Sequence, residues 1–172
     1  MKTDALPSTA FRPGNSMNTR FLCDRHLGKL AKWLRILGYD TLWNPADMSQ
    51  DFLRRGGRDG RIALTRKRDL EGVGLDRLIV VKADRVDEQI GEILDKLALT
   101  PDPKDRLTLC LRCNATLEAV VKEGMEGAVP AHVYQNNTCF RRCPICGRIY
   151  WRGTHTRNVE EFLRRHIPTH PP

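Results

Sequence analysis

The chain has 172 residues, of which 40% are hydrophobic, so it can form one ordinary domain or two small ones with a core of limited size. No stretch approaches ~18 consecutive uncharged apolar residues, and residues 1–20 lack an apolar signal segment, so we expect neither a membrane span nor a secretory signal. The formal net charge of +8 favours a polyanionic partner, most simply nucleic acid, although a generically basic protein would carry the same charge.

The first predicted elements follow a polar N-terminal segment. Residues 1–19 are rich in Pro, Ser, Thr and Asn, and we expect them to form a disordered tail. The apolar run 21–23 predicts a buried strand. Residues 27–37 predict an amphipathic helix, because leucines recur at helical spacing opposite basic residues, and Gly38 is placed to end it.

Strands and helices continue to alternate up to residue 99. We expect strands at 39–43, 61–65 and 78–81, a helix at 86–97, and a short helix ending near Leu53 that Ser49 or Asp51 would cap. This alternation is typical of βαβ units, so we predict an α/β domain over 20–99 built on a parallel sheet with flanking helices.

The C-terminal part begins after a Pro-rich linker at 100–103. We expect a zinc ribbon over 105–155 and a basic tail over 157–172 with a helix at 159–166. The 29 residues between the second and third ribbon cysteines exceed the ~15–20 of a simple ribbon, so we expect inserted structure, with a helix around 117–122.

Two Cys-x-x-Cys pairs predict the zinc site. Four thiolates satisfy tetrahedral zinc, and the residues that follow the pairs, Asn114 and Gly147, readily adopt the positive φ that such a turn needs. The expected ligands are Cys110, Cys113, Cys143 and Cys146. A redox dithiol is the alternative interpretation of such pairs.

The remaining cysteines leave one pairing open. Cys139 could pair with Cys143 in place of Cys146, but we favour Cys146 because Gly147 completes that turn, and we expect Cys23 to be a buried thiol. Cysteines grouped for a metal suit a reducing compartment better than a disulfide framework does, so we expect a cytoplasmic protein.

Acidic residues follow each predicted strand of the α/β domain. Ligands of open parallel sheets bind outside the carboxyl ends of the strands, so these carboxylates can converge on one crevice. Carboxylates without thiols or imidazoles favour Mg²⁺ or Mn²⁺, and two such ions can support phosphodiester hydrolysis. The candidates are Asp24, Asp47, Asp51, Asp69, Asp84 and Asp87.

The segment from Phe21 to Thr41, FLCDRHLGKLAKWLRILGYDT, resembles the opening of the Mut-seven C-terminal RNAse domain family. The likeness continues at 51–53, 60–66, 87–89, 143–151 and 153–155, so it covers roughly 20–156. The resemblance implies a PIN-like nuclease domain joined to a zinc ribbon, and metal-dependent cleavage of RNA. It also implies that Asp24 and Asp51 bind Mg²⁺ or Mn²⁺. We expect Asp69 or Asp84 to complete the catalytic site.

The chain departs from the family pattern after Thr65-Arg66. The family usually has an aspartate at the next position, which here is Lys67, and Asp69 could replace it only if the turn is rearranged. The alternative function is therefore a catalytically weak or inactive nucleic-acid-binding protein of the same fold. Asp24 and Asp51 would then be helix caps. In either case we expect phosphate contacts from Arg25, Lys67, Arg141 and Arg142.

Overall fold

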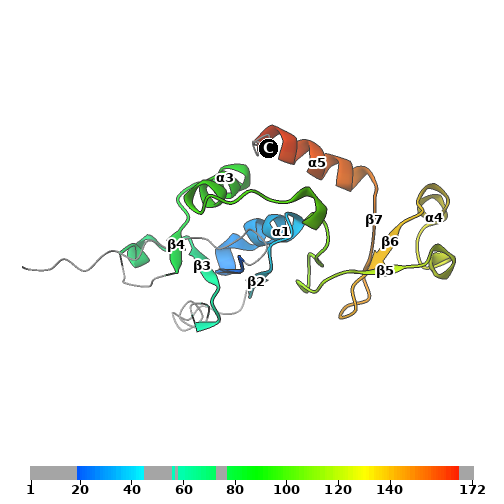
Figure 1. Cartoon of the computed structure of the whole chain (residues 1–172), viewed down its shortest axis with the longest axis horizontal. Coiled ribbons are helices and arrows are strands. Elements are labelled where there is room, and N and C mark those ends of the chain that lie inside the picture. The colour runs from blue at the N-terminus through cyan, green and yellow to red at the C-terminus, as the bar shows by residue number, and fades with distance from the viewer. Residues whose placement is uncertain (1–18, 45–55, 57, 73–76, 167–172) are drawn as a thin grey trace, which may run out of the picture.

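The computed structural model describes residues 19–44, 56, 58–72 and 77–166, which form an α/β part and a ribbon part side by side (Figure 1). The α/β part contains a four-stranded parallel sheet in the order β2-β1-β3-β4. Its strands are β1 (Phe21–Cys23), β2 (Thr41–Trp43), β3 (Ile62–Thr65) and β4 (Leu78–Val80). Because all four run in the same direction, their carboxyl ends lie at one edge of the sheet.

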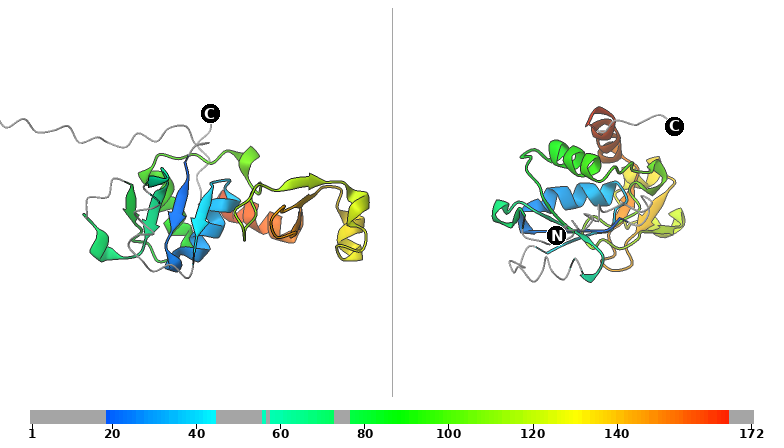
Figure 2. Two further views of the ribbon diagram at one scale, coloured as in Figure 1. Left: turned by 90° about the horizontal axis from the view of Figure 1, so that it is seen from below. Right: turned by 60° about the vertical axis from the view of Figure 1, so that its left-hand side comes forward.

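Helices α1 (Gly28–Ile36) and α3 (Val86–Lys96) pack together on one face of this sheet (Figure 2). Side chains alternate between the two faces of a strand, so Phe21 and Cys23 join the core under the helices while Leu22, though buried, lies outside this cluster. The leucines and isoleucines that gave the two helices their predicted apolar faces are the residues that fill this core.

The ribbon part is a three-stranded antiparallel sheet in the order β5-β6-β7. Its strands are β5 (Glu118–Val120), β6 (Phe140–Arg142) and β7 (Ile149–Trp151). The long insertion before β6 contains the short helix α4 (Ala131–Asn136), and it forms a small core of its own around Met125, Val133 and Phe140.

Helix α5 (Thr154–His166) leaves the ribbon and returns to the α/β part beside α3 (Figure 1). Leu163 is only 2% exposed within the main core, and the ring of Phe162 stacks on that of Trp33 with centroids 4.1 Å apart. The residues expected to form a basic tail from 157 therefore begin inside a helix that packs onto the first part of the chain.

Four short 3-10 helices complete the described elements. They are η2 (Arg25–Leu27), η3 (Arg68–Leu70), η4 (Pro103–Asp105) and η5 (Lys122–Met125). Within the described ranges, every helix is too short or too polar to cross a lipid bilayer.

The expected parallel α/β sheet with flanking helices, followed by a cysteine-bearing ribbon, is confirmed. The expected helix at 117–122 is wrong: residues 118–120 are a strand, because they pair with β6, where Ala119 lies opposite Arg141. The expected disordered tail, up to residue 18, and the short helix near Leu53 lie outside the described residues.

The docking of α5 predicts a large stability loss in Leu163→Ala. Removing this buried side chain should lower the free energy of unfolding by about 2–5 kcal/mol, since it opens a cavity in the main core. Arg164→Ala is the matched control on the exposed side of the same helix, and it should change stability by less than about 0.5 kcal/mol. Urea unfolding measures both; equal stability of the two variants would show that α5 is not docked as described.

Candidate functional site

Asp24 lies where β1 ends, beside the end of β3, and its carboxylate is held on both oxygens. Oδ1 accepts a hydrogen bond from the His26 N–H at 2.8 Å. Oδ2 accepts bonds from the Thr65 hydroxyl at 2.6 Å and from the Arg66 N–H at 3.0 Å. Its side chain is 9% exposed. The carboxylate therefore joins the ends of two adjacent strands and also caps the turn into η2.

This geometry leaves Asp24 able to bind one more group. A carboxylate offers about four acceptor sites, and three are used here; the fourth is on Oδ1, which lies 3.6 Å from His26 Nδ1, beyond hydrogen-bond distance. The three bonds offset the cost of burying the charge and fix its orientation, as such bonds do for the ligands of metal ions. Asp24 can thus be both a cap and a ligand for one hard cation.

Arg66 connects the ends of β3 and β4. Its guanidinium donates to the Ala83 carbonyl and forms an ion pair with the Asp84 carboxylate at 2.6 Å. This hydrogen bond and charge lower the pKa of Asp84, which is strongly exposed. Asp84 therefore already has a cationic partner in Arg66.

Lys67 is half-buried, and its N–H donates to the Thr65 hydroxyl at 3.1 Å.

The predicted acidic residues are only partly assembled in the described part of the chain. Asp69 lies exposed in η3. No three carboxylates among the described residues bring their oxygens within 4.8 Å of one another, so Asp24, Asp69 and Asp84 do not by themselves form a compact metal cage. Asp51, the second expected ligand, lies outside the described residues, as does Asp47.

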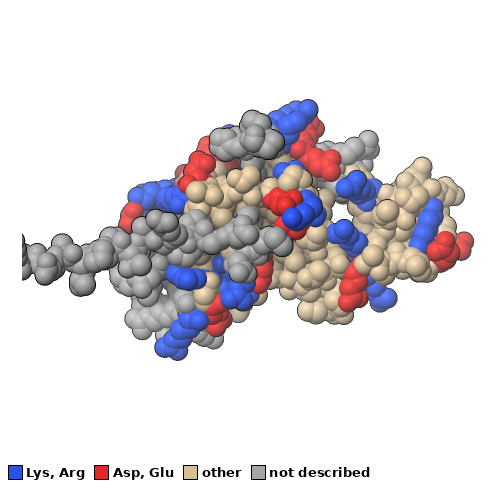
Figure 3. Space-filling view, in the orientation of Figure 1, with Lys and Arg blue, Asp and Glu red and all other residues tan. Residues whose placement is uncertain are grey.

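The predicted phosphate contacts lie in both parts of the molecule. Arg25 in η2 follows Asp24 and donates to His26 Nε2 at 3.1 Å. Arg141 and Arg142 are exposed on β6. Lys and Arg side chains lie scattered among acidic ones on the face shown in Figure 3, so the positive charge of the chain is not gathered there into one stripe.

The four predicted cysteines come together as a group whose sulfurs all lie within 4.8 Å of one another. The sulfurs of Cys110 and Cys146 are 3.8 Å apart, which matches the about 3.8 Å separation that Zn–S bonds of about 2.3 Å give in a tetrahedron. Cys139 is exposed and outside the group, so the described geometry favours the expected pairing of Cys143 with Cys146.

Each Cys-x-x-Cys turn has the predicted backbone geometry. Asn114 has a φ of 64° and Gly147 a φ of 69°, and the N–H of each donates to the carbonyl of the first cysteine of its pair at 2.9 Å. Burial opposes ionisation of Cys110, but hydrogen bonds from the Tyr150 hydroxyl and the backbone lower the pKa of its thiol to about 6. Burial and the neighbouring thiols of Cys146 and Cys110 raise the pKa of Cys113 to about 12, so the four thiols do not ionise alike. It is the closeness of the four sulfurs that suits the group to zinc.

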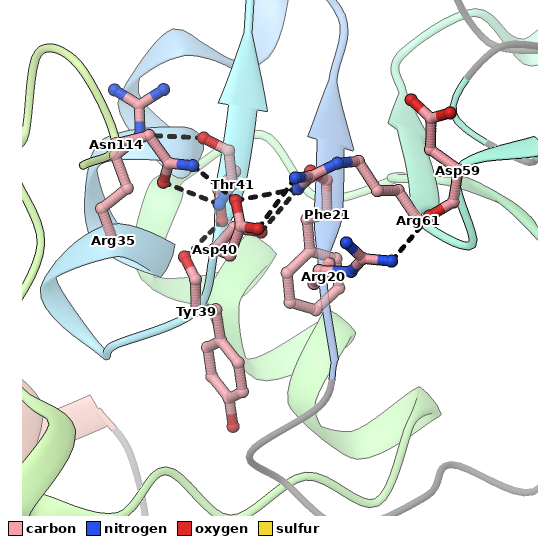
Figure 4. A network of polar contacts seen from close by, with 9 residues as sticks. All are labelled: Arg20, Phe21, Arg35, Tyr39, Asp40, Thr41, Asp59, Arg61 and Asn114. Carbon is pink, nitrogen blue, oxygen red and sulfur yellow. Dashed lines mark hydrogen bonds and ion pairs between the residues drawn. The ribbon is translucent and has the colours of Figure 1, made fainter. Parts of the chain in front are cut away.

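The turn after Cys113 also hydrogen-bonds to β2, the outermost strand of the parallel sheet (Figure 4). The Thr41 N–H of edge strand β2 donates to Asn114 Oδ1 at 2.9 Å, and Asn114 Nδ2 donates to the Asp40 carboxylate. Asp40 in turn forms a bidentate pair with Arg61 at 2.8 and 2.9 Å. Burial disfavours its charge, but the bonds from Arg61 and Asn114 outweigh this and lower the pKa of Asp40.

Arg35 adds a second link between the same elements. It is 3% exposed, and it donates to the Thr41 carbonyl at 2.9 Å and to the Leu111 carbonyl, between the paired cysteines, at 2.7 Å. Sequence reasoning missed this connection and the role of Arg66. The positive φ expected of Asn114 was visible in the sequence, but its partners 73 and 74 residues away were not.

Comparison with known proteins gives one family. A family model described as the Mut7-C RNAse domain matches residues 19–163, which is most of the chain. No curated protein matches the chain significantly.

The cysteine geometry predicts different effects for two cysteine substitutions. Cys143→Ser should lose the roughly one zinc ion per chain that a four-thiolate site holds, because it removes a ligand. Cys139→Ser is the matched control and should keep its zinc, since its sulfur lies outside the group. Elemental analysis after dialysis against a weak chelator measures both. Zinc loss in the Cys139→Ser control as well as in Cys143→Ser would assign the site to the Cys139 pairing.

Asn114→Gly separates the two roles of Asn114. Glycine keeps the positive φ, so the zinc content should stay unchanged. The Thr41 N–H and Asp40 each lose a partner, so the free energy of unfolding should fall by about 1–3 kcal/mol. Chemical unfolding with a parallel zinc assay tests this, and a variant as stable as the wild type would contradict the described contact.

Proposed function

The chain belongs to the Mut7-C RNAse domain family, and from this and the geometry of Asp24 we propose that it is a metal-dependent ribonuclease hydrolysing RNA phosphodiester bonds. The reaction would take place at the carboxyl edge of the parallel sheet. Asp24 and Asp51 would bind Mg²⁺ or Mn²⁺, and Asp69 or Asp84 would complete the site. The four cysteines would hold a structural zinc ion.

The observation that carries this proposal is the way Asp24 is held. A residue that only caps a helix needs one bond from its side chain to a backbone N–H. The carboxylate of Asp24 has such a bond and two more from the neighbouring strand, which fix the direction of its remaining acceptor site. Its location, outside the carboxyl end of a parallel strand, is where open α/β sheets bind ligands.

Each part of the edge would have a separate task in hydrolysis. Bound ions would supply the activated water and stabilise the leaving oxygen. The Thr65 hydroxyl and the Arg66 N–H keep the Asp24 carboxylate in position. Lys67 and Arg25 bring positive charge to the same edge for the phosphates. On the ribbon, Arg141 and Arg142 would hold the RNA backbone without reading its sequence.

A second candidate function is favoured by a specific observation. Lys67 occupies the position where the resemblance leads us to expect an aspartate, and the nearby Asp84 is paired with Arg66. Two cationic side chains at this edge attract phosphate but weaken the binding of a second metal ion. A nucleic-acid-binding protein with little or no catalytic activity would have this charge arrangement.

Cleavage of labelled single-stranded RNA with Mn²⁺ tests the proposal through Asp24→Asn. Residues that only orient a metal ligand typically contribute about 10–100-fold to activity, so losing the ligand itself should reduce cleavage by about 100-fold or more. RNA binding should change little, because the substitution nearly preserves shape. Asp95→Asn, an exposed aspartate on α3, is the control and should cleave like the wild type.

Two results would contradict this expectation. If the wild type and Asp24→Asn cleave equally, the acidic edge is not the active site. If neither cleaves while both bind RNA, the second candidate function takes the place of the first. In that case Lys67→Asp should weaken RNA binding and reduce the salt slope of the affinity by about 1, as expected for the loss of a phosphate contact.

A further inference from the structure

A pocket of about 400 Å³ lies where the linker, the ribbon and two helices meet. Its apolar wall comes from leucines of the linker and the ribbon, from Ile36 at the end of α1 and from Val159 on α5. The aromatic side chains of Tyr150 and Trp151, on β7, also line it. A pocket of this size with a mainly apolar wall is large enough for a small organic group.

Three arginines line the same pocket, and none of them forms an ion pair with a carboxylate of the described residues. Arg106 buries its Nε, which has no hydrogen-bond partner within the described ranges. The Arg141 guanidinium donates to the Leu107 carbonyl, at 3.3 Å. Neither these two nor Arg152 forms an ion pair with a carboxylate of the described residues. Guanidinium groups that form no ion pair and lie beside an apolar wall favour a ligand that is both anionic and partly apolar.

We propose that this pocket binds one unpaired nucleotide of an RNA strand. The base would pack against Trp151 and Leu109, and the adjacent phosphates would accept hydrogen bonds from Arg106, Arg141 and Arg152. Bases stack on aromatic and guanidinium planes whatever their sequence, and arginine suits the geometry of phosphate oxygens. A peptide that carries only acidic side chains would use the arginines but would leave the apolar wall without a matching group.

The pocket is separate from the proposed cleavage edge. Ile36 is the last residue of α1, whereas Asp24 precedes the first turn of that helix. The nine residues of α1 extend about 12 Å, so a base in the pocket is not at the bond being cleaved. The pocket would hold a part of the RNA strand that is distant from the cleaved bond. A role of the pocket in selecting substrates rests on the proposed ribonuclease function.

Binding to RNA without added divalent ions tests the pocket apart from cleavage. Fluorescence anisotropy with labelled oligouridylate should show at least about fivefold weaker binding for Leu109→Trp, which fills the pocket, and for Arg106→Gln, which removes a charge. Arg164→Gln, an exposed arginine on α5, is the matched control and should bind within about twofold of the wild type. Zinc content and circular dichroism establish that each variant is folded.

An abasic strand with the same number of phosphates identifies what enters the pocket. The wild type should bind the abasic strand as weakly as Leu109→Trp binds oligouridylate. The Leu109→Trp variant should bind the abasic strand no more weakly than the wild type does. If both pocket variants bind oligouridylate like the control, the pocket does not bind RNA, and an acidic peptide becomes its candidate ligand. If binding depends on the pocket but no RNA is cleaved with Mn²⁺, the nuclease function fails and the nucleotide site stands.

Discussion

The structure depends on one turn of backbone after Cys113, where Asn114 adopts a positive φ. Its N–H closes the cysteine turn, and its side chain hydrogen-bonds the N–H of Thr41 and the carboxylate of Asp40. The same residue therefore shapes half of the cysteine group and hydrogen-bonds the edge strand of the parallel sheet. If the group binds a structural metal, the folding free energy that the metal contributes would reach the α/β part through this contact.

Other contacts make the two parts of the chain mutually dependent. Arg35 reaches from α1 into the first cysteine turn, and α5 returns from the ribbon to place Leu163 in the main core. The α/β part that carries Asp24 is thus contacted by segments from the second half of the chain. This arrangement also creates the arginine-lined pocket, because the linker and β7 have to meet where the ribbon joins α1.

Local patterns in the sequence predicted most of the fold. The apolar run 21–23, the helical spacing of leucines in α1 and the paired cysteines each specify their structure within a few residues. Long-range contacts could not be inferred in this way. The 118–120 strand forms because it pairs with β6, and Asn114 meets Thr41 across 73 residues. The positive φ of Asn114 was predicted from its type, but nothing nearby in the sequence indicates its partners.

The candidate site was predicted in its location more than in its chemistry. Asp24 was proposed because it directly follows a strand, yet its bonds come from Thr65 and Arg66, which lie 41 and 42 residues away. The pairing of Asp84 with Arg66 is also invisible in the sequence, and it limits the metal-binding role that the strand-end pattern suggested for Asp84. The family resemblance was needed to choose nuclease activity over a helix cap.

The most direct test of the account is the position of Mn²⁺ in a crystal of the protein soaked in that ion, located by anomalous diffraction. We predict a manganese ion bound to Asp24 Oδ1 and to a second carboxylate, that of Asp51, with the bonds from Thr65 and Arg66 to Asp24 Oδ2 unchanged. A crystal with no manganese at this edge, and with Asp24 holding only its three hydrogen bonds, would contradict the metal-dependent mechanism.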